Sequence, residues 1–443
     1  MIDYLSVSDN TAEDPLELGA HFSLDTITWA SRMISDSRRA VKDEWDRIAG
    51  IRRVNQRRVL NAYRRARITE MHLSGTTGYG YGDPARDGLE EIYSELFATE
   101  SALVRPQVVS GTHAISATLF GLCRPGDEIL SATGTPYDTL QRVLKGPNSL
   151  DDWGITYREV PLLNDTQIDA REVLAAISPK TRIVMFQRSR GYLLRPSFTP
   201  AEIGAVVRQI KSIHPHVICF ADNCYGEFVE ETEPTHHGID IMAGSLIKNP
   251  GGTLAPAGGY VVGKKTLVRQ VADHIVAPGL GYKVGPMLGL GRALLQGLYL
   301  APLLVGEALC GSILAAHAFA QLGYEVYPRW NEHRTDTVQA ISLRNAEAVL
   351  LFCRAIQNCS PIDSTAVPEP DELPGYADPV VMAAGTFVQG ASSELTADAP
   401  MRPPYTVFMQ GGSSRDQTEM ALELALQYLA EHGHVSTTNQ LAR

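Results

Sequence analysis

Residues 244–252 read GSLIKNPGG and place one lysine, Lys248, in a turn between small residues. Most lysines are solvated surface charges, so the turn alone indicates no function. Earlier in the chain, the apolar run 217–221 ends at a carboxylate, Asp222. A turn lysine and a strand-end aspartate are the two groups that a pyridoxal phosphate (PLP) site needs. The lysine forms a Schiff base with the aldehyde, and the carboxylate keeps the pyridine nitrogen protonated.

The composition indicates a large soluble protein. The chain has 443 residues, 44% of them hydrophobic, which suits a large core and two or three domains. Its 39 basic and 50 acidic side chains give a net charge of −11, which argues against nucleic acid and anionic membrane as partners. Six cysteines without paired spacing predict reduced, mostly buried thiols of a cytoplasmic protein and no metal site.

Two segments must be distinguished from targeting or membrane segments: the N-terminus and the most apolar stretch of the chain. The N-terminus is acidic and polar, unlike a signal peptide. The most apolar stretch, 293–322, is interrupted by Pro302 and by polar residues. It therefore predicts a buried or subunit-interface helix, broken near the proline, rather than a membrane span.

Three regions follow one another along the chain. Residues 1–70 are charged and carry a helical stripe of apolar side chains, which predicts an amphipathic helical arm. Residues 71–300 alternate apolar strands and helices, which predicts an α/β domain with a mostly parallel sheet between helices. Residues 301–443 predict a smaller α+β domain. Strands are expected at 104–109, 129–132, 155–160, 182–186, 217–221, 258–262, 324–327, 337–341, 383–388 and 406–409.

Three features fall just after expected strands, where parallel sheets collect their ligands. Gly111 and Thr112 open the helix expected at 112–122, and Asp222 and Lys248 are the other two features. The free N–H groups in the first turn of that helix would hold a phosphate. An isolated Ser-Gly-Thr is more often a helix cap without a ligand, so the phosphate reading depends on the other two features.

Six longer stretches carry a resemblance to a known family. They are VRPQVVSGTHAIS (104–116), RPGDEILSATGTPYDTL (124–140), FQRSRGYLLRPS (186–197), ADNCYGEFVE (221–230), GSLIKNPGGTLAPAGGY (244–260) and FVQGASSELTADAPMRPPYTVFMQGG (387–412). With them the chain resembles the fold-type-I PLP enzymes of cysteine and methionine metabolism, the cystathionine and methionine lyase group. The likeness covers about residues 70 to 430 and is greatest to the bacterial branch labelled aluminium-resistance or methionine γ-lyase-like proteins.

The resemblance implies a role for each central residue. Lys248 would be the Schiff-base lysine and the acid/base that moves the substrate's α-proton, with desolvation and the cofactor's charge lowering its pKa. Asp222 would pair with the pyridinium nitrogen. Gly111 and Thr112, with Ser245, would hold the phosphate.

The family completes its phosphate site with a Tyr-x-Arg motif from a neighbouring subunit. This chain has Tyr79-Gly80-Tyr81, which supplies tyrosines but no arginine, and the two tyrosines alternatively only pack a loop. A shared site implies a homodimer or homotetramer. An aromatic ring is also expected over the cofactor. Spacing favours Tyr137, whereas motif alignment gives Thr133, which has no π-face.

Two further residues complete the implied site. Tyr225 is placed to hydrogen-bond the cofactor's phenolic oxygen, by analogy with aminotransferases, and a core tyrosine is the alternative. Arg402 lies where the family binds the substrate carboxylate, a planar two-oxygen target that suits a guanidinium. An arginine beside prolines is otherwise a surface residue.

The expected function is a PLP-dependent carbon–sulfur lyase that acts on a sulfur-containing L-amino acid such as cystathionine or methionine. Elimination of a β- or γ-leaving group would give a keto acid, ammonia and a thiol. Three alternatives stay open: an aminotransferase, a γ-replacement synthase on a larger sulfonium substrate, and a catalytically weak PLP-binding scaffold. Fold alone does not separate them.

Overall fold

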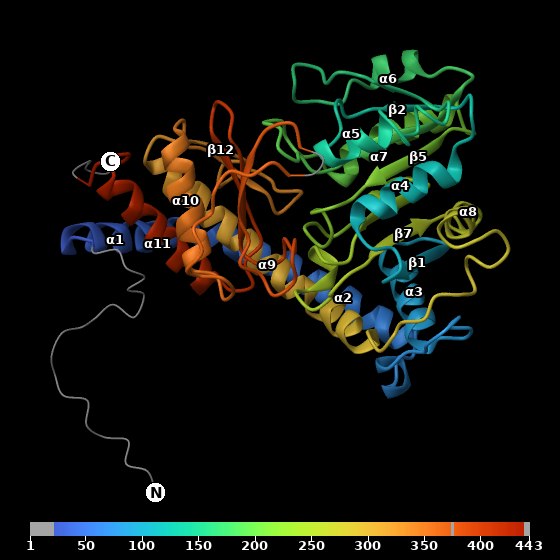
Figure 1. Cartoon of the computed structure of the whole chain (residues 1–443), viewed down its shortest axis with the longest axis horizontal. Coiled ribbons are helices and arrows are strands. Elements are labelled where there is room, and N and C mark those ends of the chain that lie inside the picture. The colour runs from blue at the N-terminus through green and yellow to red at the C-terminus, as the bar shows by residue number, and fades with distance from the viewer. Residues whose placement is uncertain (1–21, 374–375, 438–443) are drawn as a thin grey trace, which may run out of the picture.

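The computed structural model describes residues 22–373 and 376–437. Its first elements form the predicted arm, of which residues 1–21 lie outside the described part. Helix α1 (Leu24–Ala40) lies against α11 (Arg415–Glu431), and α2 (Lys42–Arg65) runs along α9 (Gly291–Gln321) (Figure 1). The Thr26 hydroxyl donates a 2.7 Å hydrogen bond to Glu431 Oε1. The arm therefore packs on the chain's own helices.

The large domain is built on a seven-stranded sheet in the order β1-β7-β6-β5-β4-β2-β3. The strands β2 to β6 pair in parallel, whereas β7 pairs antiparallel with both β6 and β1. The predicted α/β class and mostly parallel sheet are confirmed. The strands are β1 (Ser101–Arg105), β2 (Glu128–Ser131), β3 (Thr156–Glu159), β4 (Thr181–Gln187), β5 (Ile218–Asp222), β6 (Ile241–Ser245) and β7 (Gly259–Gly263).

Helices cover both faces of this sheet because successive side chains of each strand point to opposite faces and pack in two different hydrophobic cores. In β5, Ile218 and Phe220 pack with α4 and α8 on one face, while Cys219 and Ala221 pack with α3 and α7 on the other. The helical elements of this domain are η1 (Glu70–Leu73), α3 (Pro84–Leu96), α4 (Gly111–Leu122), α5 (Asp138–Leu144), α6 (Ala170–Ala176), α7 (Pro200–Ile213), η2 (Pro234–His237), η3 (Asn249–Gly251) and α8 (Lys265–Ile275).

Helix α9 joins the two domains and crosses the boundary expected between residues 300 and 301 (Figure 1). The break expected near Pro302 was wrong, because the helix continues through the proline. Leu298, Ala301 and Val305 on either side are buried, and their packing outweighs the hydrogen bond that proline removes. Within the described residues, α9 is the one helix apolar and long enough for a membrane span. Since 72% of its apolar window is buried, it is a core helix.

The small domain is an antiparallel sheet in the order β10-β11-β12-β9-β8, packed against α10 and the end of α9, and α11 packs on these two helices. The expected α+β character of this region is present. Its elements are β8 (Glu325–Tyr327), β9 (Gln339–Ser342), α10 (Ala346–Asn358), β10 (Val380–Ala383), β11 (Thr396–Pro400) and β12 (Thr406–Gln410). All six cysteines are free, and five of them are buried, as the sequence predicted.

Candidate active site

Lys248 follows β6 and lies on the wall of a cavity of about 150 Å³ at the carboxyl ends of β4, β5 and β6. The chain turns after it through η3, and Asn249 Nδ2 donates to the carbonyls of Tyr225 and Glu227, each at 3.0 Å. These bonds fix the lysine turn to the loop that follows Asp222. The amine therefore has a defined position relative to that carboxylate.

Asp222 ends β5, is nearly fully buried and lines the same cavity. Its Oδ1 accepts a 3.0 Å hydrogen bond from the Cys224 N–H. Burial raises the pKa of Asp222, and the Cys224 N–H and the charge of Lys248 offset this only in part. A cation placed beside this carboxylate would offset the remaining desolvation, which is what a protonated pyridine nitrogen supplies.

The ammonium of Lys248 lies 3.8 Å from the centroid of the Tyr225 ring. Burial alone lowers the pKa of Lys248, but Cys224, Tyr225 and Asp222 together outweigh burial and raise it. The expected lowering by desolvation is present but is outweighed by these neighbours, and the lowering by the cofactor's charge stays a prediction. Burial also raises the pKa of Tyr225 to about 12, so this phenol is neutral near pH 7.

Tyr225 has a positive φ of 71°, an uncommon conformation for a residue with a large side chain. The backbone is held there by two contacts, the Asn249 amide on the Tyr225 carbonyl and the Thr337 N–H on the same oxygen at 3.3 Å. Strain of this kind persists where the surroundings fix it, and it is common at functional sites. It turns the Tyr225 ring toward Lys248.

The opposite end of the cavity is the start of α4. Ser110 caps this helix by accepting a 3.1 Å hydrogen bond from the His113 N–H, and the Gly111 and Thr112 N–H groups point away from the helix body. A Cβ at Gly111 would lie 3.0 Å from Ser245 Cβ and 3.2 Å from Cys224 Sγ. Only glycine leaves room for a ligand between the helix start and the end of β6, so the residues present fit a phosphate.

Tyr137 lines the cavity at the start of α5. Its N–H donates a 2.7 Å hydrogen bond to Gln187 Oε1. Thr133 is fully buried, accepts a 3.0 Å bond from the Gln187 N–H and does not line the cavity. Of the two candidates for a ring over the cofactor, the structure brings only Tyr137 to the cavity.

Tyr79, Tyr81 and Arg402 do not join Lys248 within the described chain. Tyr79 and Tyr81 are stacked on each other, and 68% and 60% of their surfaces are exposed. Arg402 Nη1 donates a hydrogen bond to Asp378 Oδ2 at 2.6 Å. The Arg402 side chain lines a different cavity, together with Tyr192, Pro403 and Pro404. These three residues remain candidates for contacts that involve a second subunit or a bound substrate.

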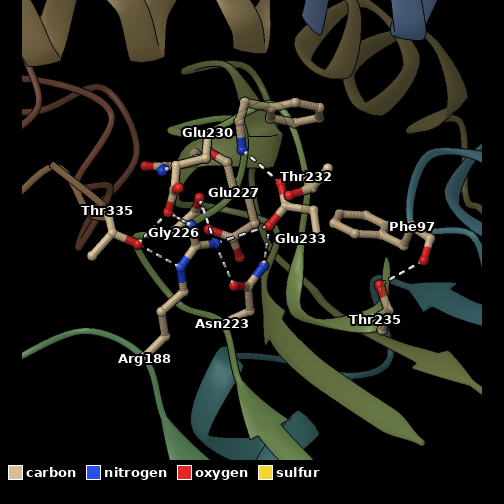
Figure 2. A network of polar contacts seen from close by, with 12 residues as sticks. Phe97, Arg188, Asn223, Gly226, Glu227, Glu230, Thr232, Glu233, Thr235 and Thr335 are labelled. Atoms are coloured by element: carbon tan, nitrogen blue, oxygen red, sulfur yellow. Dashed lines mark hydrogen bonds and ion pairs between the residues drawn. The ribbon is translucent and has the colours of Figure 1, made fainter. Parts of the chain in front are cut away.

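A buried network under the cavity holds the loop that carries Asp222 and Tyr225 (Figure 2). Arg188 Nη1 donates to Asn223 Oδ1, the Gly226 carbonyl and Glu233 Oε2, each at 2.9 Å. Arg188 Nη2 donates to Glu230 Oε1 at 3.0 Å, and its Nε donates to Thr335 Oγ1 at 3.1 Å. Thr335 lies in the small domain, between β8 and β9. The Arg188 guanidinium therefore links the two domains beside the site.

Sequence reasoning missed several residues of the cavity wall. Gln187 is the last residue of β4, Ser189 and Gly191 follow this strand, and Cys224 follows Asp222. Their position at strand ends was the available signal. Asp398 on β11 was also missed. It lies in the small domain, is nearly fully buried and interacts electrostatically with Lys248. No local pattern marks it, because only tertiary packing brings β11 to the site.

The donor set fits PLP. Lys248 would bind the aldehyde, Asp222 would face the ring nitrogen, and the first turn of α4 with Ser245 would hold the phosphate. When bound, this cofactor supplies an electron sink for a negative charge at the substrate's α-carbon. The chain's own contribution would be the Lys248 amine, able to carry a proton, and the Tyr225 ring that lies 3.8 Å from it.

Comparisons with known proteins agree with this donor set. Residues 30–430 match the family model described as methionine gamma-lyase. The uncharacterized protein YnbB of Bacillus subtilis is 47% identical over 382 residues, which cover 85% of this chain and 91% of YnbB.

Two solved structures extend the comparison. A Listeria monocytogenes protein, provisionally named a cystathionine beta-lyase involved in aluminum resistance, is 44% identical with a TM-score of 0.88, covering 90% of this chain and all of that one. A carbon-sulfur lyase involved in aluminum resistance from Clostridium novyi is 40% identical with a TM-score of 0.87, covering 90% of this chain and 96% of that one. The predicted family and fold type are confirmed: this chain belongs to the methionine gamma-lyase family of fold-type-I PLP-dependent proteins.

Proposed function

We propose that this protein is a PLP-dependent carbon–sulfur lyase that removes a sulfur-bearing leaving group from an L-amino acid. The observation that carries the proposal is the single cavity that collects Lys248, Asp222 and the start of α4. The family match and the similarity to a carbon-sulfur lyase support the reaction class. Cystathionine and methionine are the first substrates to test.

The residues divide the work by position. Asp222 keeps a positive charge at the ring end of the cavity, and the α4 N–H groups neutralise a phosphate at the other end. Among the described residues that line the cavity, Lys248 is the one amine, so it takes and returns the proton at the substrate's α-carbon. Gln187 and Tyr137, joined by their 2.7 Å hydrogen bond, close the side of the cavity against water.

The test uses the purified protein. Borohydride reduction followed by peptide mass spectrometry should locate the cofactor on the peptide that contains Lys248. An amino-acid panel should then yield keto acid, ammonia and thiol. Keto acid formed only with an added amino acceptor, and without thiol, would instead identify an aminotransferase. A new thioether in the presence of an added thiol would identify a replacement enzyme, and coloured but inert protein would identify a scaffold.

We also propose a cytoplasmic homodimer or homotetramer with shared sites. The support is the exposed, stacked pair Tyr79 and Tyr81, which lies outside its own chain's cavity. Tyr79→Phe should then weaken cofactor retention during dialysis while the elution volume on size exclusion stays that of an oligomer. Tyr299→Phe, at another exposed tyrosine, is the control. Equal retention by both variants would contradict the shared site.

A further inference from the structure

The arm helix α2 contacts the stretch of chain that follows β5, defined here as the Asp222 segment (residues 222–230). Asn55 lies within α2 and is 0% exposed. Its Nδ2 donates two hydrogen bonds, to the Phe228 carbonyl at 2.8 Å and to the Glu230 carbonyl at 3.1 Å. These acceptors lie 173 and 175 positions away along the chain. The contact therefore joins the arm to the large domain at the end of the Asp222 segment.

The orientation of the Asn55 amide is fixed by its oxygen. Asn55 Oδ1 accepts a 2.8 Å hydrogen bond from Arg58 Nη1, and Arg58 Nη2 donates to the Leu96 carbonyl at 2.6 Å. Because an arginine can only donate, the amide oxygen must face Arg58 and the amide nitrogen must face the two carbonyls. Phe228 has a positive φ of 62°, an uncommon conformation for a bulky residue, so the donor from Asn55 helps to hold a strained backbone.

The Asp222 segment carries part of the cavity wall, since Asp222 and Tyr225 line the cavity. From the side of the lysine turn, Asn249 holds the segment through the two carbonyl hydrogen bonds described above. From the side of the arm, Asn55 holds its other end. The segment is therefore fixed between two asparagine amides, one next to Lys248 and one on α2.

Helix α2 also supports the turn that carries Lys248. A Cβ at Gly297 of α9 would lie 2.1 Å from the Gly251 carbonyl oxygen, so only glycine allows α9 to contact this turn. Helix α2 runs along the same part of α9, where the Tyr63 hydroxyl donates to the Leu295 carbonyl (Figure 1). The arm therefore contacts the Asp222 segment directly and supports the lysine turn through α9.

These contacts give the arm a role in the geometry of the site. We propose that α2 positions the two parts of the active site relative to each other and that Asn55 is the positioning residue. Asn55 does not line the cavity, so it acts through the Asp222 segment. Without its amide, the two carbonyls lose this donor, and the segment opens more often. The proposal rests on the proposed function for the roles of Asp222 and Lys248.

The first measurement uses cofactor-free protein and the thiol of Cys224 as a probe, because Cys224 belongs to the Asp222 segment and is only 8% exposed. Labelling with iodoacetamide, followed by peptide mass spectrometry, gives the reaction rate at each cysteine. In Asn55→Ala, Cys224 should react at least about 10-fold faster than in the wild type, whereas Cys353 in the small domain should keep its rate. An equal increase at both thiols would indicate general destabilisation and overturn the proposal.

The matched control is Asn358→Ala. Asn358 is also a buried asparagine of a helix, and its Nδ2 also donates to a backbone carbonyl, that of Ser364 at 2.6 Å. It belongs to α10, the helix that carries Cys353. This variant should leave the labelling rate of Cys224 unchanged, because its lost hydrogen bond lies far from the Asp222 segment. An increase at Cys224 equal to that in Asn55→Ala would contradict the assignment.

The second measurement is the dissociation constant of PLP, followed by absorbance. Asn55→Ala should raise this constant by about 10-fold or more, and Asn358→Ala should change it by less than about 2-fold. Asn55→Ser is the milder variant, since its hydroxyl keeps one shorter donor, and both its labelling rate and its dissociation constant should be intermediate. Wild-type values of both quantities in a folded Asn55 variant would overturn the proposal. Faster labelling of Cys224 in a protein whose wild type binds no PLP would refute the proposed function alone.

Discussion

Arg188 offers the sharpest test of how the site is held together. Its side chain is 0% exposed, and the guanidinium makes five hydrogen bonds, two of them to the carboxylates of Glu230 and Glu233. Arg188→Met keeps the apolar stem and removes the charge. Glu233, itself 1% exposed, then loses its charged donor and keeps neutral donors such as the Asn223 amide and the Phe228 N–H. Removing one partner of a buried ion pair costs about 3–5 kcal/mol.

Urea unfolding at one fixed protein concentration measures this loss. The matched control is Arg158→Met, because Arg158 also holds a carboxylate with two hydrogen bonds, at 2.7 and 2.9 Å to Glu128. The Arg158 side chain is 45% exposed, so its loss should cost less than about 1 kcal/mol. Similar losses of unfolding free energy in the two variants would refute the claim that burial determines the cost of removing the arginine.

A second variant separates the uncompensated charge from the lost packing. Adding Glu233→Gln to Arg188→Met removes the buried carboxylate that lost its partner. The double variant should therefore be more stable than Arg188→Met alone, although neither reaches the wild type. Additive losses would show that the two residues act independently. Cofactor retention should fall in Arg188→Met, because Asn223 and Gly226 anchor the loop that carries Asp222 and Tyr225.

Four other changes test the remaining parts of the site. Lys248→Ala should abolish covalent cofactor attachment, so no modified peptide appears after borohydride reduction. Asp222→Asn should retain cofactor but lower kcat by about 10²–10³-fold in the lyase assay. Gly111→Ala should increase cofactor loss on dialysis, because its Cβ would enter the gap to Ser245. Burial raises the pKa of Glu227 to about 8, so the folded state holds more protons than the unfolded state between about pH 5 and pH 8. Stability should fall as pH rises through that window, and Glu227→Gln should lose this dependence in urea titrations.

The sequence was most informative where local pattern and tertiary role agree. The run 217–221 is apolar throughout, and β5, which begins one residue later at Ile218, is buried on both faces. The strand that delivers Lys248 gave no such signal. Residues 241–245 read IMAGS, and their small residues favour no strand, yet β6 forms because β5 and β7 pair with it on either side.

The residues of the candidate site also divide into those that the sequence revealed and those that it did not. Asp222 was found because it ends an apolar run that predicts a strand, and Lys248 because it is the single lysine of the turn 244–252. Asp398 belongs to the other sheet, and the stretch that forms β11 reads TADAP. Its alanines and proline favour no strand, so neither strand nor orientation could be inferred. It comes within electrostatic range of Lys248 through tertiary packing, and that information is not local.

Two buried carboxylates act electrostatically on Lys248, and their surroundings give them different roles. Asp398 accepts a 2.9 Å hydrogen bond from Gln410 Nε2 within the small-domain sheet and does not line the cavity. Asp222 accepts one hydrogen bond, from the Cys224 N–H, and lines the cavity at the end of β5. Once a cofactor engages the Lys248 amine, Asp222 is the carboxylate on the cavity wall that needs a new positive partner, and a protonated ring nitrogen would supply it.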